Sequence, residues 1–274
     1  MSNGASLAAK LDWFVGHNAG GALIGDGGEI DFGAHQIIIS NNNDAPGVIA
    51  LTNSVLTCSD LRFSYNNSKG NSQTVILKDT LVNLAKFVYY HKTAASSILF
   101  DGATLVPTGA AANFMPSGLP TTTLGAGGLV ISNAYDVTAA LSMTGEGGLV
   151  KKGDGALTLT GAQTFSGDVI VQDGAFVAAT TFAGGLRAAS GAMIDVADAT
   201  FGGNIVIGEN VAMAATNGVD WAEVKAVPVA KTTASDVSFP AGRDANGRHF
   251  FVRSSDGITV LYYGKQPGLM IVIR

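Results

Sequence analysis

The sequence is poor in charged residues and has one cysteine, Cys58, and each shortage excludes a class of protein. Charged residues make up 14% of the chain, against about 25% in an average soluble domain, and apolar residues make up 47%. This composition is not that of a disordered protein. A single cysteine cannot form an intrachain disulfide or a cysteine-based zinc site, and in the stretch LTCSDL we expect it to be a small buried side chain.

Long apolar runs and clusters of basic residues are also missing. No stretch approaches the ~18 apolar residues of a membrane helix, so we predict no transmembrane segment. The opening residues, MSNGASLAAKLDWFVGHN, contain no apolar run long enough for a signal peptide. The formal net charge is −5 at pH 7. Without a basic surface to bind phosphates, nucleic acid is not an expected partner.

Glycine, by contrast, is abundant, at 36 of 274 residues, where about 7% is usual. Many Val, Ile, Leu and Thr residues accompany it. The combination favours short strands joined by tight turns, because β-branched residues suit strands and glycine suits sharply turning backbone.

One phrase recurs along the chain: an apolar run, then Asn or Asp with a small residue, then another apolar run. Its centres are Asp26-Gly27, Asn53-Ser54, Asp79-Thr80, Asp101-Gly102, Asn133-Ala134, Asp154-Gly155, Asp173-Gly174 and Asp198-Ala199. The steps between them are 27, 26, 22, 32, 21, 19 and 25 residues. Repeats in this range are typical of solenoids, in which each repeat forms one coil.

Stacking explains why such a coil would repeat. Three short strands cannot bury their inward side chains alone, but coils about 4.8 Å apart complete one another's hydrogen bonds and share one core. In ALTLT, Leu157 and Leu159 alternate with Thr158 and Thr160, as a half-buried strand requires. We therefore predict an all-β, single-stranded parallel β-helix (solenoid) of about eight coils over residues 21–216. An antiparallel sandwich is the alternative.

The longest step, between Asp101 and Asn133, covers the proline-containing stretch VPTGAAANFMPSGLPTTTLG. We expect it to be a loop inserted at one corner of the solenoid, near residues 102–128. Projecting loops on a rigid scaffold commonly carry binding functions, so this stretch is the expected interaction region.

The most regular stretch is GGLVKKGDGALTLTGAQTFSGDVIVQDGAF, residues 147–176. It resembles the autotransporter-associated β-strand repeat of secreted bacterial passenger proteins. The resemblance lies in the Gly-Gly-apolar opening, Lys-x-Gly-x-Gly, LTLTGA, Phe165, Ser-Gly and the closing Asp173-Gly174. Asp168 stands where a second glycine is usual, and Phe176 where leucine is common. The resemblance implies a right-handed β-helix on or beyond the bacterial cell surface and carries over no catalytic residues.

Both ends of a solenoid need covering, because open sheet edges promote aggregation. In residues 1–20, Leu7, Leu11 and Phe14 have the i, i+4, i+7 spacing of one helix face, which predicts an N-terminal helical cap. In residues 217–274, Asp256-Gly257 between two apolar runs predicts a hairpin. We expect this region to form a small antiparallel β cap.

Few residues suggest chemistry. Glycoside hydrolases need two carboxylates about 5–9.5 Å apart, and Asp173, Asp195 and Asp198 are the candidates for a catalytic group of this kind, although turns also favour aspartate. The four histidines have no metal-binding spacing, so we predict no metal and no cofactor. In FVYYH, Tyr89 and Tyr90 are candidates for stacking on sugar rings.

The leading hypothesis is a non-enzymatic, exported surface or secreted bacterial β-helix that serves as an adhesin, spacer or matrix module. Its expected partners are host or environmental glycans or proteins. The alternative is a carbohydrate-active enzyme, a polysaccharide lyase or glycoside hydrolase, that uses the turn carboxylates. A third hypothesis is a segment of a trimeric fibre, because long β-helices often associate along their sides.

Overall fold

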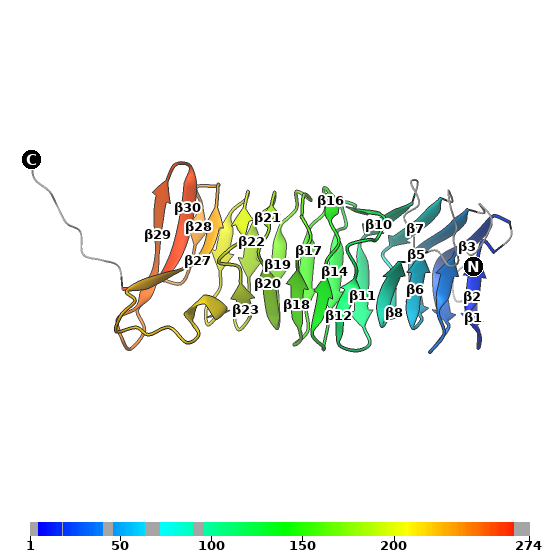
Figure 1. Cartoon of the computed structure of the whole chain (residues 1–274), viewed down its shortest axis with the longest axis horizontal. Coiled ribbons are helices and arrows are strands. Elements are labelled where there is room, and N and C mark those ends of the chain that lie inside the picture. Colours follow the sequence, from blue (N-terminus) through cyan, green and yellow to red (C-terminus); the bar gives the residue numbers. More distant parts are fainter. Residues whose placement is uncertain (1–4, 18, 41–45, 64–71, 90–95, 266–274) are drawn as a thin grey trace, which may run out of the picture.

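The chain forms a parallel β-solenoid of about eight turns, which confirms the predicted all-β architecture. The structure is a computed structural model that describes residues 5–17, 19–40, 46–63, 72–89 and 96–265. The turns follow one another along a single axis, with the first strands at one end and the C-terminal hairpin at the other (Figure 1).

Each turn contributes strands to three faces. Two long strands bend from the first face onto the second: β3 (Gly21–Asp31) and β5 (Gly47–Thr57). The other strands of the first face are β7 (Gln73–Lys78), β10 (Ser97–Asp101), β13 (Thr121–Leu124), β16 (Met143–Gly145), β21 (Thr181–Phe182), β24 (Thr200–Phe201) and β27 (Ala226–Thr232). The second face adds β1 (Ala5–Ala8), β8 (Leu81–Leu84), β11 (Ala103–Pro107), β14 (Leu129–Ser132), β17 (Leu149–Lys152), β19 (Val169–Val171), β22 (Leu186–Ala188), β25 (Ile205–Ile207) and β28 (Val237–Ser238). The third comprises β2 (Trp13–Val15), β4 (Ile37–Ile39), β6 (Asp60–Phe63), β9 (Lys86–Tyr89), β12 (Ala111–Met115), β15 (Val137–Ala139), β18 (Ala156–Leu159), β20 (Ala175–Ala178), β23 (Met193–Asp195) and β26 (Ala212–Met213).

Parallel pairing places equivalent residues of successive turns in columns that run along the axis. On the second face, Leu129 pairs with Leu149, Leu149 with Val169, and Val169 with Leu186. All four side chains point inward and are buried. One column of aliphatic side chains therefore passes from turn to turn, and burial of this kind stabilises by about 25 cal/mol per Å² of apolar surface.

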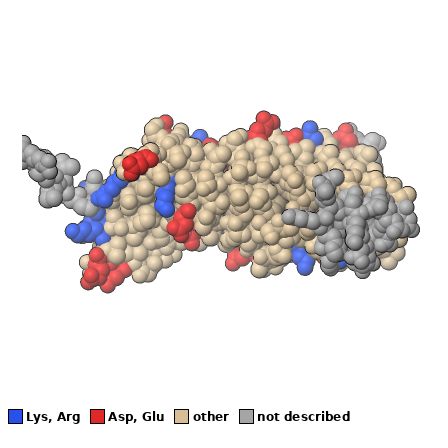
Figure 2. Space-filling view, turned by 45° about the horizontal axis from the view of Figure 1, so that its top comes forward, with Lys and Arg blue, Asp and Glu red and all other residues tan. Residues whose placement is uncertain are grey.

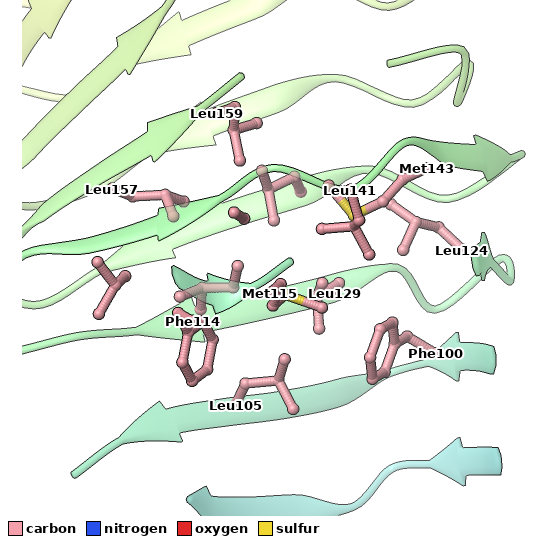
Figure 3. Close-up of a cluster of buried hydrophobic side chains, with 14 of the residues drawn as sticks. Phe100, Leu105, Phe114, Met115, Leu124, Leu129, Leu141, Met143, Leu157 and Leu159 are labelled. Atoms are coloured by element: carbon pink, nitrogen blue, oxygen red, sulfur yellow. The ribbon is translucent and has the colours of Figure 1, made fainter. Parts of the chain in front are cut away.

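The interior is filled by aliphatic and aromatic side chains contributed by all three faces. Figure 3 shows part of it, with Phe100 and Phe114 beside Leu105 and Leu129. Phe114 also lies edge-on to Phe87, with ring centroids 6.0 Å apart. One continuous core thus links the turns, as the repeat analysis predicted.

The corner between the first and second faces needs left-handed backbone in the early turns. Asn53, Asp79, Gly102 and Gly128 occupy equivalent positions there, and all have positive φ. Asn, Asp and Gly tolerate this conformation better than other residues. This is why the recurring phrase carries a turn residue between two apolar runs.

Replacing Gly128 by alanine is expected to destabilise the solenoid by at least about 1–2 kcal/mol, because a Cβ penalises left-handed backbone. Gly128 has φ +69°, and a Cβ built there would lie 2.6 Å from the carbonyl oxygen of Gly148 in the next turn. Gly109→Ala is the matched control, because its Cβ would meet nothing within 4 Å. Urea unfolding of both variants measures the difference, and equal midpoints would contradict the corner argument.

The recurring phrase does not mark one corner throughout the chain. Asn53 and Asp79 are at the corner between the first and second faces, and Asp101 lies one position before it. Asn133 instead follows β14, at the corner between the second and third faces. Asp154 and Asp173 share this second corner, whereas Asp198, after β23, lies at the corner between the third and first faces.

The long step from Asp101 to Asn133 therefore spans one complete turn of the solenoid and then the strand of one further face. The inserted loop predicted near residues 102–128 is wrong, because this stretch contains β11, β12 and β13. All three strands pair in parallel with strands of neighbouring turns. No pattern in the sequence indicates the change of corner, since any corner accepts a turn residue.

The predicted N-terminal helical cap is also wrong. Residues 5–8 and 13–15 form strands β1 and β2, and β1 pairs in parallel with the second half of β3. Leu7 packs against the core, whereas Leu11 is 75% exposed, so the three apolar residues do not form one buried face. A strand satisfies hydrogen-bonding groups at the edge of β3, which a helix laid over the end could not do.

The C-terminal end is covered by an antiparallel sheet in which β30 (Ile258–Gly264) lies between β27 and β29 (His249–Ser255). The hairpin predicted at Asp256-Gly257 is present, and both residues have the positive φ of the expected turn. A short 3₁₀ helix, η1 (Ala214–Thr216), precedes this cap. No helix in the described part of the chain is long and apolar enough to cross a membrane.

Candidate functional site

A cavity of about 610 Å³ opens where the third face turns into the first. Its lining residues are mostly hydroxyl-bearing or small: Tyr89, Ser96, Ser117, Gly118, Leu119, Pro120, Thr121, Thr122, Ser142 and Thr144. They come from the end of β9, the residue before β10, the turn before β13, strand β13, the residue before β16, and β16 itself. None of these described lining residues is charged.

The pairing register between successive turns places hydroxyl groups of this cavity one above the other. Thr122 of β13 pairs with Met143 of β16, so the preceding residues, Thr121 and Ser142, stand one above the other. Successive turns are about 4.8 Å apart, a spacing comparable with the length of one sugar ring. The side chains of Thr121 and Ser142 are exposed, so the cavity presents two hydroxyl groups one turn apart along the axis.

Several of these hydroxyls are available to a ligand. Within the described residues, no hydrogen bond involves the hydroxyl groups of Ser117, Thr121 or Ser142. The buried Thr122 hydroxyl instead donates to the carbonyl oxygen of Pro120 at 2.9 Å and holds the turn before β13. A free hydroxyl can donate one hydrogen bond and accept two, which suits ligands rich in hydroxyl groups.

Tyr89 forms the aromatic wall of the cavity. It ends β9 and is half-buried, and its ring lies over Gly118, where a Cβ would come within 2.8 Å of Tyr89 Cδ1. The absence of a side chain at residue 118 therefore lets the ring approach the turn closely. Tyr89 was a candidate binding residue from the sequence; Tyr90, the other candidate, lies outside the described residues.

The three candidate catalytic aspartates do not form a site around this cavity. Asp173 lies in the turn after β19, Asp195 ends β23 on the third face, and Asp198 lies at the next corner. Met193 pairs with Ala175, so Asp195 lies opposite Val177, whereas Asp173 lies four residues before Val177, beyond the bend at Gly174. None of the three aspartates lines the cavity.

The other residue types considered for chemistry are structural here. Cys58 is 2% exposed, and burial, with a smaller effect of Asp60, raises the pKa of its thiol to about 12. Such a thiol stays protonated at neutral pH, so Cys58 is an inert core residue. Within the residues that the structure describes, no group of three or more His, Cys, Asp or Glu side chains could hold a metal ion.

The hydroxyl groups of the cavity were not among the candidate residues predicted from the sequence, although several lie in the stretch that we expected to interact with a partner. Ser117, Thr121 and Thr122 lie in PSGLPTTTLG, which we expected to be an inserted loop. The run Thr121–Thr123 was the available signal, because alternate threonines of a strand share one face. Pairing with Ser142 could not be anticipated, since it depends on the register between turns.

No protein-family model, curated protein or solved structure matches the chain.

Proposed function

We propose that this protein is a non-enzymatic, exported surface or secreted β-solenoid that binds a neutral glycan in the cavity beside Tyr89. In this role it serves as an adhesin or matrix module, with the solenoid acting as a rigid spacer. The observation that carries the proposal is the composition of the cavity: free hydroxyls, one aromatic ring and no charged lining residue among those described. Export is supported by the resemblance of residues 147–176 to the repeats of secreted passenger proteins, which also supports a right-handed winding.

A neutral glycan fits this chemistry better than the other partners considered. Sugar rings present apolar C–H faces that can pack on an aromatic ring, and hydroxyls that bond to Ser and Thr side chains. An acidic or phosphorylated ligand would call for cationic groups, and none of the described lining residues supplies one. The surface drawn in Figure 2 is likewise mostly uncharged along the middle of the molecule.

Replacing Tyr89 by alanine is expected to weaken glycan binding by about tenfold or more, the usual cost of losing an aromatic anchor at a binding site. Tyr89→Phe, which keeps the ring, should bind almost as well as the parent protein. Binding is measured by screening a neutral-glycan array and then titrating the best ligand by calorimetry.

Two further variants separate binding from folding. Gly118→Ala places a Cβ against the Tyr89 ring, so it should weaken binding without removing the aromatic residue. Tyr135→Ala removes a tyrosine that is 49% exposed outside the cavity, and should leave binding unchanged. Failure of the parent protein to bind any neutral glycan, or equal binding by Tyr89→Ala, would contradict the proposal.

The carbohydrate-active enzyme is the competing function. Its candidate carboxylates, Asp173, Asp195 and Asp198, lie outside the Tyr89 cavity. Incubation with polysaccharides, followed by assays for reducing ends and unsaturated uronates, tests it directly. Turnover that disappears in Asp195→Ala would overturn the non-enzymatic proposal.

A further inference from the structure

A second cavity, of about 280 Å³, lies in the C-terminal cap and, unlike the Tyr89 cavity, is lined partly by charged residues. It is lined by Trp221, Val224, Lys225, Asn246, Arg248 and Lys265. Three of these six residues are cationic and none is acidic, in a chain whose formal net charge is −5. In Figure 2, basic side chains lie at this end of the molecule, interspersed with acidic ones.

The two lysines stand opposite each other at the end of an antiparallel strand pair. Ala226 of β27 pairs with Gly264 of β30, and at the next position the Lys265 N–H donates to the Lys225 carbonyl oxygen at 2.7 Å. Neither ammonium has an ion-pair partner within the described residues. Like charges directly opposite each other are destabilising. An anion held between them would remove this repulsion.

Arg248 and Trp221 form another wall of the cavity, and contacts with Asp244 and Tyr263 hold them in place. The Arg248 guanidinium lies 4.7 Å from the Trp221 ring centroid, and its Nε donates to Asp244 Oδ2 at 2.8 Å. Tyr263 donates to the same oxygen at 3.1 Å, and its ring meets Trp221 edge-on at 6.2 Å. Asp244 thus balances Arg248, so Lys225 and Lys265 provide the uncompensated charge.

We propose that this cavity binds the carboxylate of a small ring-shaped acid, of the uronic acid class. The two ammonium groups would hold the carboxylate through charge-assisted hydrogen bonds. The Asn246 amide can both donate to and accept from ring hydroxyls, and Trp221 with Val224 offers apolar surface to ring carbons. The volume lies just below the usual range of about 300–1,000 Å³ for ligand sites, which suits one sugar-sized unit. The proposal is independent of the Tyr89 cavity, which takes a neutral ligand.

Trp221 itself reports on binding. The chain has two tryptophans, so Trp13→Phe leaves Trp221 as the sole indole fluorophore. Titration of this variant with D-glucuronate should give a saturable change in fluorescence. D-glucose and inorganic phosphate should bind at least about tenfold more weakly, because each lacks one of the two features that the cavity recognises.

In the same background, the double substitution Lys225→Gln/Lys265→Gln should weaken glucuronate binding by about tenfold or more, as expected for lost charge-assisted contacts. Lys86→Gln, which removes a lysine charge on β9 outside the cavity, is the control and should bind normally. Because the double variant relieves a like-charge pair, its unfolding midpoint should equal or exceed that of its parent.

Three results would overturn the proposal: no saturable response to glucuronate, an unchanged affinity in the correctly folded double variant, or equally tight binding of phosphate or glucose. Equal binding of phosphate would identify a general anion site, and equal binding of glucose would remove the role of the lysines. Loss of neutral-glycan binding by Tyr89→Ala would affect none of these results, so the two proposals fail separately.

Discussion

Phe182→Ala is expected to lower the free energy of unfolding by about 3–5 kcal/mol, the cost of removing a large aromatic side chain from a packed core. Phe182 is 1% exposed and lies at the centre of an aromatic cluster. Its ring stacks on Phe201, with centroids 4.9 Å apart, and meets Phe165 and Phe176 at 6.1 and 6.3 Å. These four residues come from three successive turns, so the substitution opens a cavity that joins those turns.

Urea unfolding gives the size of the effect, and Phe14→Ala serves as the control because Phe14 is 38% exposed. Hydrogen exchange adds a spatial test. Turns of a solenoid contact only their neighbours, so amides of β20–β24 should exchange faster in Phe182→Ala, whereas those of β5 and β7 should not change. A loss below about 1 kcal/mol, similar to that of an exposed site, would contradict the packing described here.

Lys151 produces the second large expected effect, a stability that rises with pH. Its side chain is fully buried and is in register with Ile131 and Val171, both inward-facing aliphatic residues. The Nζ donates to the backbone carbonyl oxygens of Lys152, Gly153 and Asp173. All three protons of the ammonium therefore have acceptors, yet the charge itself lies in the core.

Desolvation lowers the pKa of Lys151 from its ordinary 10.5 to about 8, although Asp173 and Asp154 oppose the shift. Below pH 8, Lys151 is protonated in both the folded and unfolded chain. Between pH 8 and about 10.5 the unfolded chain holds the proton more tightly, so unfolding takes up a proton and the free energy of unfolding rises with pH. At about 1.4 kcal/mol per pH unit, the gain is about 2–3 kcal/mol between pH 7 and 10.

Lys151→Met should abolish this rise, while Lys152→Met, which changes an exposed neighbour, should retain it. Urea unfolding of the three proteins at pH 7, 8, 9 and 10 isolates the contribution, because other titrating groups are common to all three. Parallel pH profiles for the parent and Lys151→Met would show that Lys151 titrates as an exposed lysine does.

Local sequence patterns were sufficient to predict the class of fold. Alternation such as that of Leu157 and Leu159 with Thr158 and Thr160 depends only on adjacent residues, and the structure buries the two leucines as expected. The Asp256-Gly257 hairpin was equally predictable, because two consecutive residues with positive φ restrict the choice of amino acid. Lys151 could not be identified as buried from its sequence, VKKGDG, in which Lys152 is equally polar.

The candidate site was only partly predictable. Tyr89 was selected as an aromatic residue in a strand-like stretch, and the structure places it in the largest of the cavities described here. Its partners Ser117, Thr121 and Ser142 come from later turns, so only the stacking of those turns brings them together. The cavity in the C-terminal cap likewise depends on pairing between Lys225 and Lys265, which are separated by most of the cap sequence.

The sequence by itself determined that the chain is a stack of short strands with an apolar interior, because alternation and left-handed turn residues are properties of neighbouring amino acids. Only the tertiary structure decided which corner each turn residue occupies, that residues 5–8 pair as a strand, and which side chains line each cavity. A turn residue is compatible with any of the three corners, and an apolar segment is compatible with a helix or a strand. The choice depends on hydrogen bonds and core contacts supplied by the adjacent turn, which lie about 20 or more residues away in the chain.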